Sequence, residues 1–322
     1  MPYFCSNASI TAGGHAAPPI TTRLRYGSLP PVALARAIDE LLRDPSVEVP
    51  ARLVQPLPGG GSLFVMPALD GRIAVTKLIT FTPANAGTTR PAIQGDVVVF
   101  DTATGERVLV LDGPTVTARR TAAVSLLAAR KLAARPEGPL LIVGAGAQGA
   151  SHLEAFVQGL RIAEVQVASR TAASAQALVE RARGLGVKAS IVSDPDAALA
   201  HCPLVVTCTP ASGVVLRSYP RDDAFIAAVG AFTPRMVELG PELCRHAARH
   251  GRVVVDTADA VHEAGDLMQA GLDVSAFPTL QDVVLGRAKP GTGPVLFKSC
   301  GWAGWDLAAA RAAVADLRPS AA

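Results

Sequence analysis

The feature that most constrains the fold is a glycine-rich turn inside the stretch LLIVGAGAQGASHLEAF, residues 140–156. Apolar residues typical of a buried strand precede the glycines, and a helical pattern follows them. The glycines stand in GxGxxG register, in which the first permits a tight turn, the second permits close approach of a pyrophosphate, and the third lets the helix pack on the strand. The turn therefore predicts a dinucleotide site with its phosphates at a helix N-terminus. The residues expected to contact the dinucleotide here are Gly144, Gly146, Ala147, Gln148 and Gly149.

The residues after the next strand indicate which dinucleotide is bound. In an NADH site, an Asp or Glu about 20 residues beyond the glycines bonds the ribose hydroxyls. Here the second strand ends in VQVASRT, so that Ser169, Arg170 and Thr171 stand where that acid is expected. A carboxylate would repel a 2′-phosphate, whereas a hydroxyl and a planar guanidinium bind it. We therefore expect NADPH, with NADH as a weaker alternative; the competing interpretation is that Arg170 is an ordinary solvated charge.

Strand and helix patterns divide the chain into two parts. Between residues 140 and 256, apolar strands alternate with helical segments, which is typical of a parallel sheet covered by helices. Before this region a helix precedes two pairs of β-branched runs, and after it a final amphipathic helix returns to the first part. We expect an α/β fold with a Rossmann domain at residues 136–289. The other domain is expected to combine residues 1–135, which begin with a loose arm at 1–28, and residues 290–322.

Composition and charge narrow the class of partner. Of the 322 residues 49% are apolar, so a sizeable core can form, and a formal charge of +3 without a dense basic tract argues against nucleic acid. No apolar run reaches the length of a membrane span and the N-terminus lacks a signal-peptide pattern, so we expect a cytoplasmic protein that does not bind a membrane. The 5 scattered cysteines are typical of reduced, mostly buried thiols, and the 6 histidines show no ligand spacing, so no metal is expected.

Cations near strand and helix ends suggest a site for an anion. They are Arg52, Lys77, Arg119 and Arg120. Lys77 lies inside the apolar strand IAVTKLITF and is the hardest to explain as a surface charge. We expect Thr115 or Thr117 to cap the long helix that follows, which places both arginines in its first turn, where the helix dipole disfavours cations. A bound anion would explain that placement, and because adjacent helix residues point about 100° apart, only one arginine is expected to face the site.

A series of motifs resembles one known family. The series includes ARLV, VTKLITFTPAN, QGDVVVFDTATGE, TARRTAA, IVGAGAQG, VVTCTP, AVGAFTPRMVEL and LFKSCGWAGWDLAAA, and it spans roughly residues 48–312. On these motifs the chain resembles the ornithine cyclodeaminase/μ-crystallin family. The resemblance implies a Rossmann domain inserted into an α/β domain that also forms a homodimer, and a substrate carboxylate bound by Arg52, Lys77 and Arg120. It also implies cofactor contacts at Thr207, Thr209, Val229 and Ser299.

Two departures from the family pattern favour reduction over oxidation. Members that cyclise ornithine carry an Asp where this chain has Phe232, and a phenyl ring cannot move protons, although it can wall the apolar ring of a substrate. The acid that follows the second strand in NAD-using members is replaced by Ser169. The resemblance therefore implies an NADPH-dependent ketimine reductase. Its expected reaction converts Δ1-pyrroline-2-carboxylate or Δ1-piperideine-2-carboxylate into L-proline or L-pipecolate.

Three other activities stay open from the sequence. One is oxidative, either ornithine cyclodeamination or an alanine-dehydrogenase-like reaction with NAD. Another is reductive amination of a 2-oxo acid at the same site. The third is binding of NADPH and a small molecule without turnover, which the joint presence of the three cations disfavours. The sequence leaves open whether Lys77 or water supplies a proton. Glu263 and Asp266 lie near the expected cofactor, but a helix-capping role is the simpler interpretation.

Overall fold

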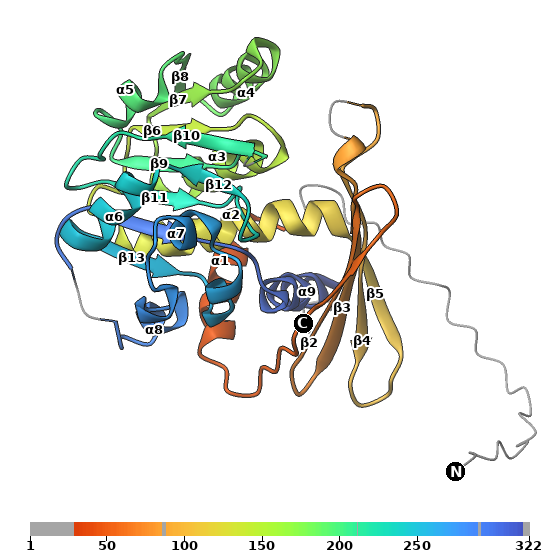
Figure 1. Ribbon diagram of the computed structural model, residues 1–322. Coiled ribbons are helices and arrows are strands. Elements are labelled where there is room, and N and C mark those ends of the chain that lie inside the picture. Colours follow the sequence, from red (N-terminus) through yellow and green to blue (C-terminus); the bar gives the residue numbers. More distant parts are fainter. Residues whose placement is uncertain (1–28, 86–87, 211, 289–290, 318–322) are drawn as a thin grey trace, which may run out of the picture.

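Two large sheets, joined by one long helix, dominate the part of the chain that the structure describes; a third sheet has only two strands. The computed structural model describes residues 29–85, 88–210, 212–288 and 291–317, so the arm expected at residues 1–28 lies outside the described residues. Within the described part, an antiparallel sheet and a larger parallel sheet stand side by side, and helix α2 (Gly113–Leu132) runs from one to the other (Figure 1).

The first sheet is an antiparallel meander with the order β1-β2-β3-β4-β5. Its strands and the helices beside it are α1 (Pro31–Leu42), β1 (Leu53–Pro56), β2 (Ser62–Leu69), β3 (Ile73–Phe81), η1 (Pro83–Asn85), β4 (Ile93–Asp101) and β5 (Arg107–Asp112). The two hairpins expected from the sequence are β2–β3 and β4–β5. Side chains alternate across a strand, so Lys77 points to the same buried face of β3 as Val75 and Ile79, while Leu78 points outward.

Helix α2 begins earlier than the sequence suggested. Its N-cap is Asp112, whose carboxylate accepts a hydrogen bond from the backbone N–H of Thr115, so the expected caps at Thr115 and Thr117 are wrong. Pro114 fits the first turn because its missing N–H would have no partner there in any case. Arg119 and Arg120 therefore lie about two turns into the helix, where the dipole argument does not apply.

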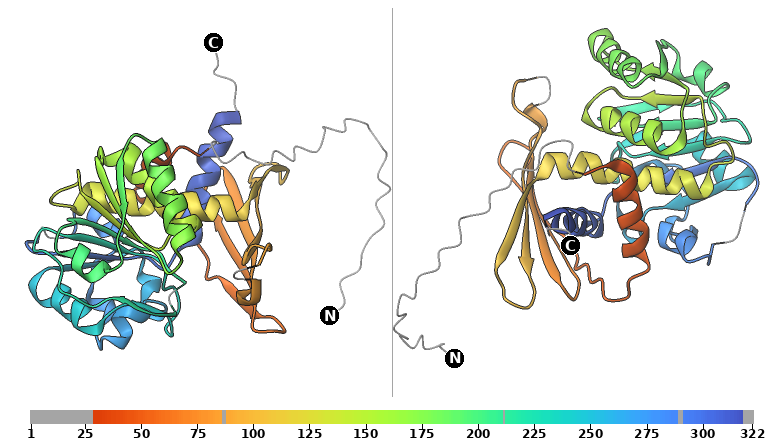
Figure 2. Two further views of the ribbon diagram at one scale, coloured as in Figure 1. Left: turned by 90° about the horizontal axis from the view of Figure 1, so that it is seen from above. Right: turned by 180° about the vertical axis from the view of Figure 1, so that it is seen from behind.

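The second sheet is parallel throughout, with the order β13-β14-β11-β9-β6-β7-β8. Along β6, Leu140 and Ile142 belong to one buried apolar cluster, whereas Leu141 and Val143 belong to another, so the sheet is covered on both faces (Figure 2). The predicted α/β fold with a Rossmann-type sheet is confirmed. Its first elements are β6 (Leu140–Val143), α3 (Ala147–Leu160), β7 (Glu164–Ala168), α4 (Ala172–Gly184), β8 (Lys188–Ile191), α5 (Pro195–Leu199) and β9 (Leu204–Thr207).

The later elements of this part include several that the sequence patterns did not predict. They are β10 (Ser212–Leu216), β11 (Phe225–Ala228), β12 (Val237–Leu239), α6 (Pro241–His250), β13 (Arg252–Val255), η2 (Ala258–His262), α7 (Gly265–Gln269), η3 (Val274–Ala276), α8 (Leu280–Val284) and β14 (Val295–Lys298). β14 pairs with β11 and β13, so the parallel sheet continues past residue 289, where we expected the domain to end. Helix α9 (Ala303–Leu317) then returns and packs against β2 and β3.

Three further expectations concerned the state of the cysteines, membrane spans and metal binding. Within the described ranges the free cysteines Cys202, Cys208, Cys244 and Cys300 are all buried. None of the helices described is long and apolar enough to cross a membrane. In the same residues, no group of three or more His, Cys, Asp or Glu side chains could hold a metal ion.

Candidate functional site

The glycine turn follows the central strand β6 at the point where the strand order reverses between β6 and β9. Ligands of open parallel sheets bind outside the carboxyl ends of the strands at such a point. Gly144 has φ +117°, and a Cβ there would lie 2.7 Å from the backbone oxygen of Cys208. A Cβ on Gly149 would overlap the backbone oxygen of Gly144, whereas a Cβ on Gly146 would meet nothing within 4 Å. No side chain caps α3, so its N-terminus fits the phosphates of a dinucleotide.

The segment after β7 lies beside this turn. The backbone N–H of Gly144 donates to the oxygen of Ala168, the last residue of β7, over 2.9 Å. Ser169 follows and is half-buried, while Arg170 and Thr171 are exposed at the start of α4. The structure thus places the Ser169–Thr171 segment at the edge of the glycine turn, where the adenosine ribose lies in Rossmann sites.

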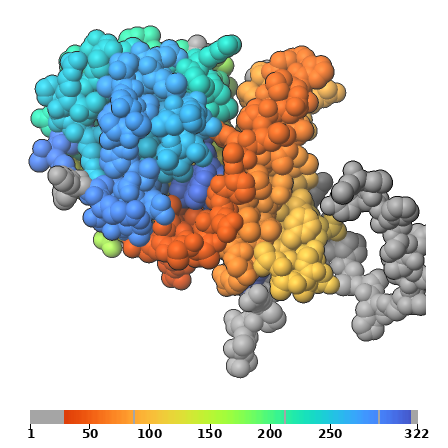
Figure 3. Space-filling model, turned by 60° about the horizontal axis from the view of Figure 1, so that its bottom comes forward, coloured from red at the N-terminus to blue at the C-terminus, as the bar shows by residue number. Residues whose placement is uncertain are grey.

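A cavity of about 190 Å³ lies between the two sheets and brings the predicted substrate residues together. Arg52, Lys77 and Arg120 all line it, although they come from the segment before β1, from β3 and from α2. Predicted cofactor contacts line it as well: Gln148, Thr209, Val229 and Ser299. The two parts that enclose the cavity meet along a furrow in Figure 3.

The remaining wall of the cavity is largely apolar. Its apolar side chains include Phe64, Met66, Ile79, Phe81, Ile93 and Phe232. The rings of Phe81, on β3, and Phe232, on the loop after β11, meet edge to face with centroids 6.1 Å apart, so this pair joins the two sides of the cavity. Among the described residues that line the cavity, none is an Asp or a Glu.

Lys77 is the most deeply buried cation of the cavity, and a carboxylate from α9 holds it. Its ammonium donates to Oδ1 of Asp306 over 3.1 Å and lies 2.9 Å from Oδ2. Both side chains are buried, at 1% and 0% exposure. Burial lowers the pKa of Lys77 to about 8, while the charge of Asp306 opposes that shift. Asp306 escaped the sequence analysis because it is 229 residues away in the chain.

The neighbouring arginines of α2 serve different parts of the molecule. Arg120 lines the cavity, and its Nε lies 3.4 Å from Oδ1 of Asp306. Arg119 points to α3, where it donates to Glu154 over 2.5 Å, and Glu154 also accepts from Arg181 on α4. Each of the two buried arginines thus has a carboxylate partner. These pairings explain why α2 can carry two adjacent cations, and no interaction with the helix dipole is needed to explain it.

Arg52 contacts an acid from the parallel-sheet part. Its guanidinium forms an ion pair with Glu263, which follows η2 in the parallel-sheet part. Burial lowers the pKa of Arg52. Asp266 is fully buried; its Oδ1 accepts from the backbone N–H groups of Glu238 and Leu239, and its Oδ2 lies 2.7 Å from the ammonium of Lys298. Glu263 thus lies against a predicted substrate residue, whereas Asp266 holds the backbone of β12 and pairs with Lys298.

A buried carboxylate that the sequence analysis missed holds the cofactor side of the cavity in shape. Glu238 is 0% exposed and accepts hydrogen bonds from the backbone N–H groups of Thr209 and Gly230 and from the hydroxyls of Thr207 and Thr209. Burial raises its pKa. Thr209 lines the cavity, whereas the fully buried Thr207 does not, so the structure brings only one of the two predicted threonines to the cavity wall.

A second carboxylate, Asp256, holds the opposite rim. Its Oδ2 accepts from the hydroxyl of Ser299 at 2.8 Å and from the backbone N–H groups of Cys300 and Gly301 at 2.9 and 2.8 Å. All three of these partners line the cavity. Asp256 directly follows β13, at the carboxyl end of a strand, which is a position that sequence reasoning could have noted, whereas Glu238 lies within the short strand β12.

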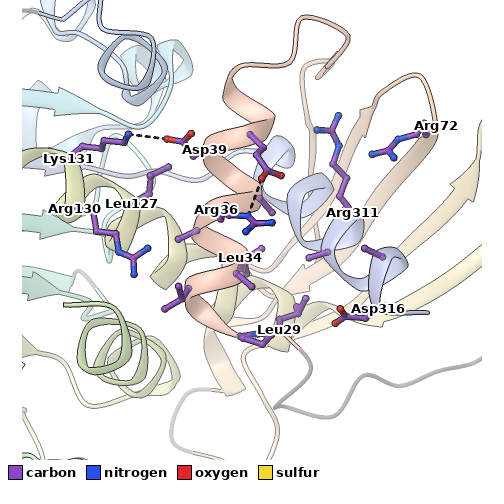
Figure 4. A pocket seen from close by; sticks show the side chains of 18 residues that line it. Leu29, Leu34, Arg36, Asp39, Arg72, Leu127, Arg130, Lys131, Arg311 and Asp316 are labelled. Atoms are coloured by element: carbon purple, nitrogen blue, oxygen red, sulfur yellow. Dashed lines mark hydrogen bonds and ion pairs between the residues drawn. The ribbon is translucent and has the colours of Figure 1, made fainter. Parts of the chain in front are cut away.

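A larger hollow of about 1060 Å³ lies between α1, α2 and α9, away from this cavity (Figure 4). Much of its charge is already paired: Lys131 lies 3.3 Å from Asp39, and Arg36 lies 3.1 Å from Glu40. None of the residues predicted from the sequence to bind substrate or cofactor lines it. The smaller cavity is therefore the candidate site.

Comparisons with known proteins agree with the resemblance seen in the motifs. A model of the Ornithine cyclodeaminase/mu-crystallin family matches residues 33–318. The chain is 40% identical over 264 residues to Delta(1)-pyrroline-2-carboxylate reductase 1 of Burkholderia multivorans, covering 82% of this chain and 83% of that protein. It is 39% identical over 265 residues to Delta(1)-pyrroline-2-carboxylate/Delta(1)-piperideine-2-carboxylate reductase of Azospirillum brasilense, again covering 82% and 83%. The structure of an archaeal alanine dehydrogenase dimer with bound NAD matches with a TM-score of 0.81 and 25% identity, covering 90% of this chain and 93% of that one.

Proposed function

Because the chain belongs to the ornithine cyclodeaminase/mu-crystallin family, we propose that it is an NADPH-dependent imine reductase. Its substrates are cyclic α-imino acids, Δ1-pyrroline-2-carboxylate and Δ1-piperideine-2-carboxylate, and its products are L-proline and L-pipecolate. The observation that carries the proposal is the cavity itself, which joins three cations to an apolar wall beside the expected cofactor contacts. Two relatives that bear the names of such reductases, at 40% and 39% identity, support the choice of substrate.

The cations and the apolar wall match the two ends of such a substrate. Arg52 and Arg120 bind the carboxylate, for which the planar guanidinium is well suited. The ring then lies against Phe81 and Phe232, and Lys77 is left near the ring nitrogen. Fixing both ends of a small rigid molecule orients the imine carbon, and orientation is the chief requirement for hydride transfer to that carbon.

The groups that line the cavity favour imine reduction over ornithine cyclodeamination. Cyclodeamination also needs a group that handles protons while ammonia leaves, and Phe232 cannot act as one. No carboxylate was found among the described residues of the lining. When bound, NADPH supplies the hydride. The chain holds the carboxylate, orients the imine and excludes water from a cavity of about 190 Å³.

The preference for NADPH rests on the segment after β7. Ser169 and Arg170 follow the last residue of that strand, and the backbone of Gly144 bonds to it. The exposed guanidinium of Arg170 is free of an acidic neighbour in the sequence and can turn toward a 2′-phosphate. In this arrangement the glycine turn binds the pyrophosphate, and Ser169, Arg170 and Thr171 bind the phosphorylated ribose.

The antiparallel sheet also offers a surface for a homodimer. Leu53, Leu78 and Phe100 lie on its outer face with exposures of 57%, 46% and 37%, and α2 and α9 cover the inner face. An apolar face of this kind is typical of an interface. We place the dimer contact there and the enzyme in the cytoplasm. Light scattering should give the mass of two chains, and Leu78→Asp should give the mass of one.

The test of the proposed function is a nicotinamide absorbance assay with the purified full chain. NADPH should be consumed with Δ1-pyrroline-2-carboxylate, faster than NADH, and L-proline should accumulate in equal amount. Consumption only when ornithine and NAD are mixed, with release of ammonia, would establish the oxidative alternative. NADPH binding without turnover of either imino acid would establish a binding protein.

A further inference from the structure

We propose that Asp306 is a positioning residue that holds Lys77 as the proton donor to the ring nitrogen of the substrate. The inference rests on the proposed function and deepens it, because it names the source of the proton. Asp306 does not touch the cavity, whereas Lys77 lines it. The carboxylate therefore acts through the ammonium and not on the substrate.

The geometry fixes the direction in which Lys77 can act. The two oxygens of Asp306 lie 3.1 and 2.9 Å from Nζ, behind the cavity wall. An ammonium has three N–H groups, so at least one is left to point into the cavity. Asp306 is also 3.4 Å from Nε of Arg120, so one carboxylate holds a proton donor and a carboxylate-binding arginine in a common frame.

The ring nitrogen takes up a proton after hydride transfer whatever the charge of the substrate. As C2 of the ring accepts the hydride from the reduced nicotinamide, the π pair of the C=N bond moves onto nitrogen and the nicotinamide is oxidised. From a neutral imine, nitrogen then takes a proton to become the amine. From a protonated imine, the amine that forms has a lone pair and takes a proton to become the ammonium found in the product. In both cases an N–H bond of Lys77 breaks, an N–H bond of the substrate forms, and solvent reprotonates Lys77 after product leaves.

The charges that face Lys77 determine how its protonation responds to pH. They are Asp306 from α9, Arg120 from α2 and Arg52 from the segment before β1, while the residues paired with Lys77 in β2 and β4 are apolar. The pKa of Lys77 is lowered to about 8, chiefly by burial and in part by the two arginines, so only Asp306 among these charges raises it. The donor form is present below that pH and is lost above it. Removing the charge of Asp306 lowers the pKa and moves the loss of activity to lower pH.

The experiment compares the pH dependence of kcat/KM in the wild type, Asp306→Asn and Asp266→Asn. Asparagine keeps the shape of the side chain but removes its charge. Asp266 provides a matched control because it is equally buried and 2.7 Å from an equally buried lysine, Lys298, that does not line the cavity. Asp306→Asn should move the alkaline limb down by about one pH unit or more, whereas Asp266→Asn should leave its position unchanged. If the alkaline limb of the pH profile came from titration of the substrate imine, it would lie at the same pH in all three proteins.

A second variant covers the case in which Asp306→Asn does not fold. Lys77→Arg keeps a cation beside Asp306 but removes a group that can release its proton. It should lower kcat by about 100-fold or more while inhibition by L-proline is retained. An alkaline limb that stays in place in Asp306→Asn, or near-normal turnover by Lys77→Arg, would overturn the inference while leaving the proposed function intact. A wild type that reduces no imino acid would overturn both.

Discussion

Replacing Arg120 with Ala should remove most of the reductase activity while NADPH still binds. Arg120 is 6% exposed and lines the cavity opposite the apolar wall, so the substrate carboxylate would lose a charged partner where water cannot replace it. Loss of one partner from such a pair costs about 2–5 kcal/mol. Since about 1.36 kcal/mol corresponds to a factor of ten, kcat/KM should fall by roughly 30- to 5000-fold.

The adjacent arginine supplies the control. Arg119 is 5% exposed in the same helix, but its carboxylate partner is Glu154, outside the cavity. Arg119→Ala should lower the free energy of unfolding by about 1–3 kcal/mol and leave the KM for the imino acid unchanged. Steady-state kinetics, fluorescence titration with NADPH and thermal unfolding separate the two effects. Equal losses of kcat/KM in both variants, or a near-normal KM in Arg120→Ala, would refute the assignment of Arg120 to the substrate.

Three further substitutions test other parts of the site. Arg170→Ala should weaken NADPH by about 10- to 100-fold and leave NADH nearly unchanged, because a charge-assisted bond to the 2′-phosphate is lost; equal effects on the KM of both cofactors would contradict this. Phe232→Ala should raise the ratio of kcat/KM for the six-membered over the five-membered imino acid by about tenfold or more, since the contact with Phe81 at 6.1 Å is removed; an unchanged ratio would exclude this wall as the determinant of ring size. Glu238→Gln should lower the free energy of unfolding by about 1–3 kcal/mol, because in either amide orientation its NH2 group faces a backbone N–H, and thermal unfolding measures the loss.

Elements with a strong local pattern were predictable from the sequence. The strand at Leu140–Val143 lies where the apolar run ends at the glycines, and α3 begins directly after the turn. Both hairpins of the antiparallel sheet follow their β-branched runs. The start of α2 was missed because Asp112, the true cap, ends a strand whose pattern runs straight into the helix. β14 was missed because it is only four residues long, and nothing in the sequence around it indicates that it pairs with strands of the parallel sheet.

Residues of the candidate site differ in how far the sequence could place them. Lys77 stood out because a lone ammonium in an apolar strand needs a partner, and the structure places it in the cavity wall. Sequence alone could not choose between Arg119 and Arg120, since the choice depends on whether Glu154 or Asp306 lies opposite. The acids Glu238 and Asp256 hold loops through backbone N–H groups, and no residue spacing reports such contacts before the chain is folded.

The pairing of Asp306 with Lys77 shows how far a sequence alone can identify two residues that meet only in the folded chain. Its neighbours Trp305, Leu307, Ala308 and Ala309 are all fully buried, so an aspartate among them cannot reach water. The stretch AGWDLAAA therefore contains one charge in an apolar helix, just as IAVTKLITF contains one in an apolar strand. Buried charges persist only in pairs, which means that two isolated charges of opposite sign in apolar elements are candidates for each other. That rule identifies the partners, but only the return of α9 against β3 shows that their pairing lies at the wall of a cavity, where one of them can also act on a substrate.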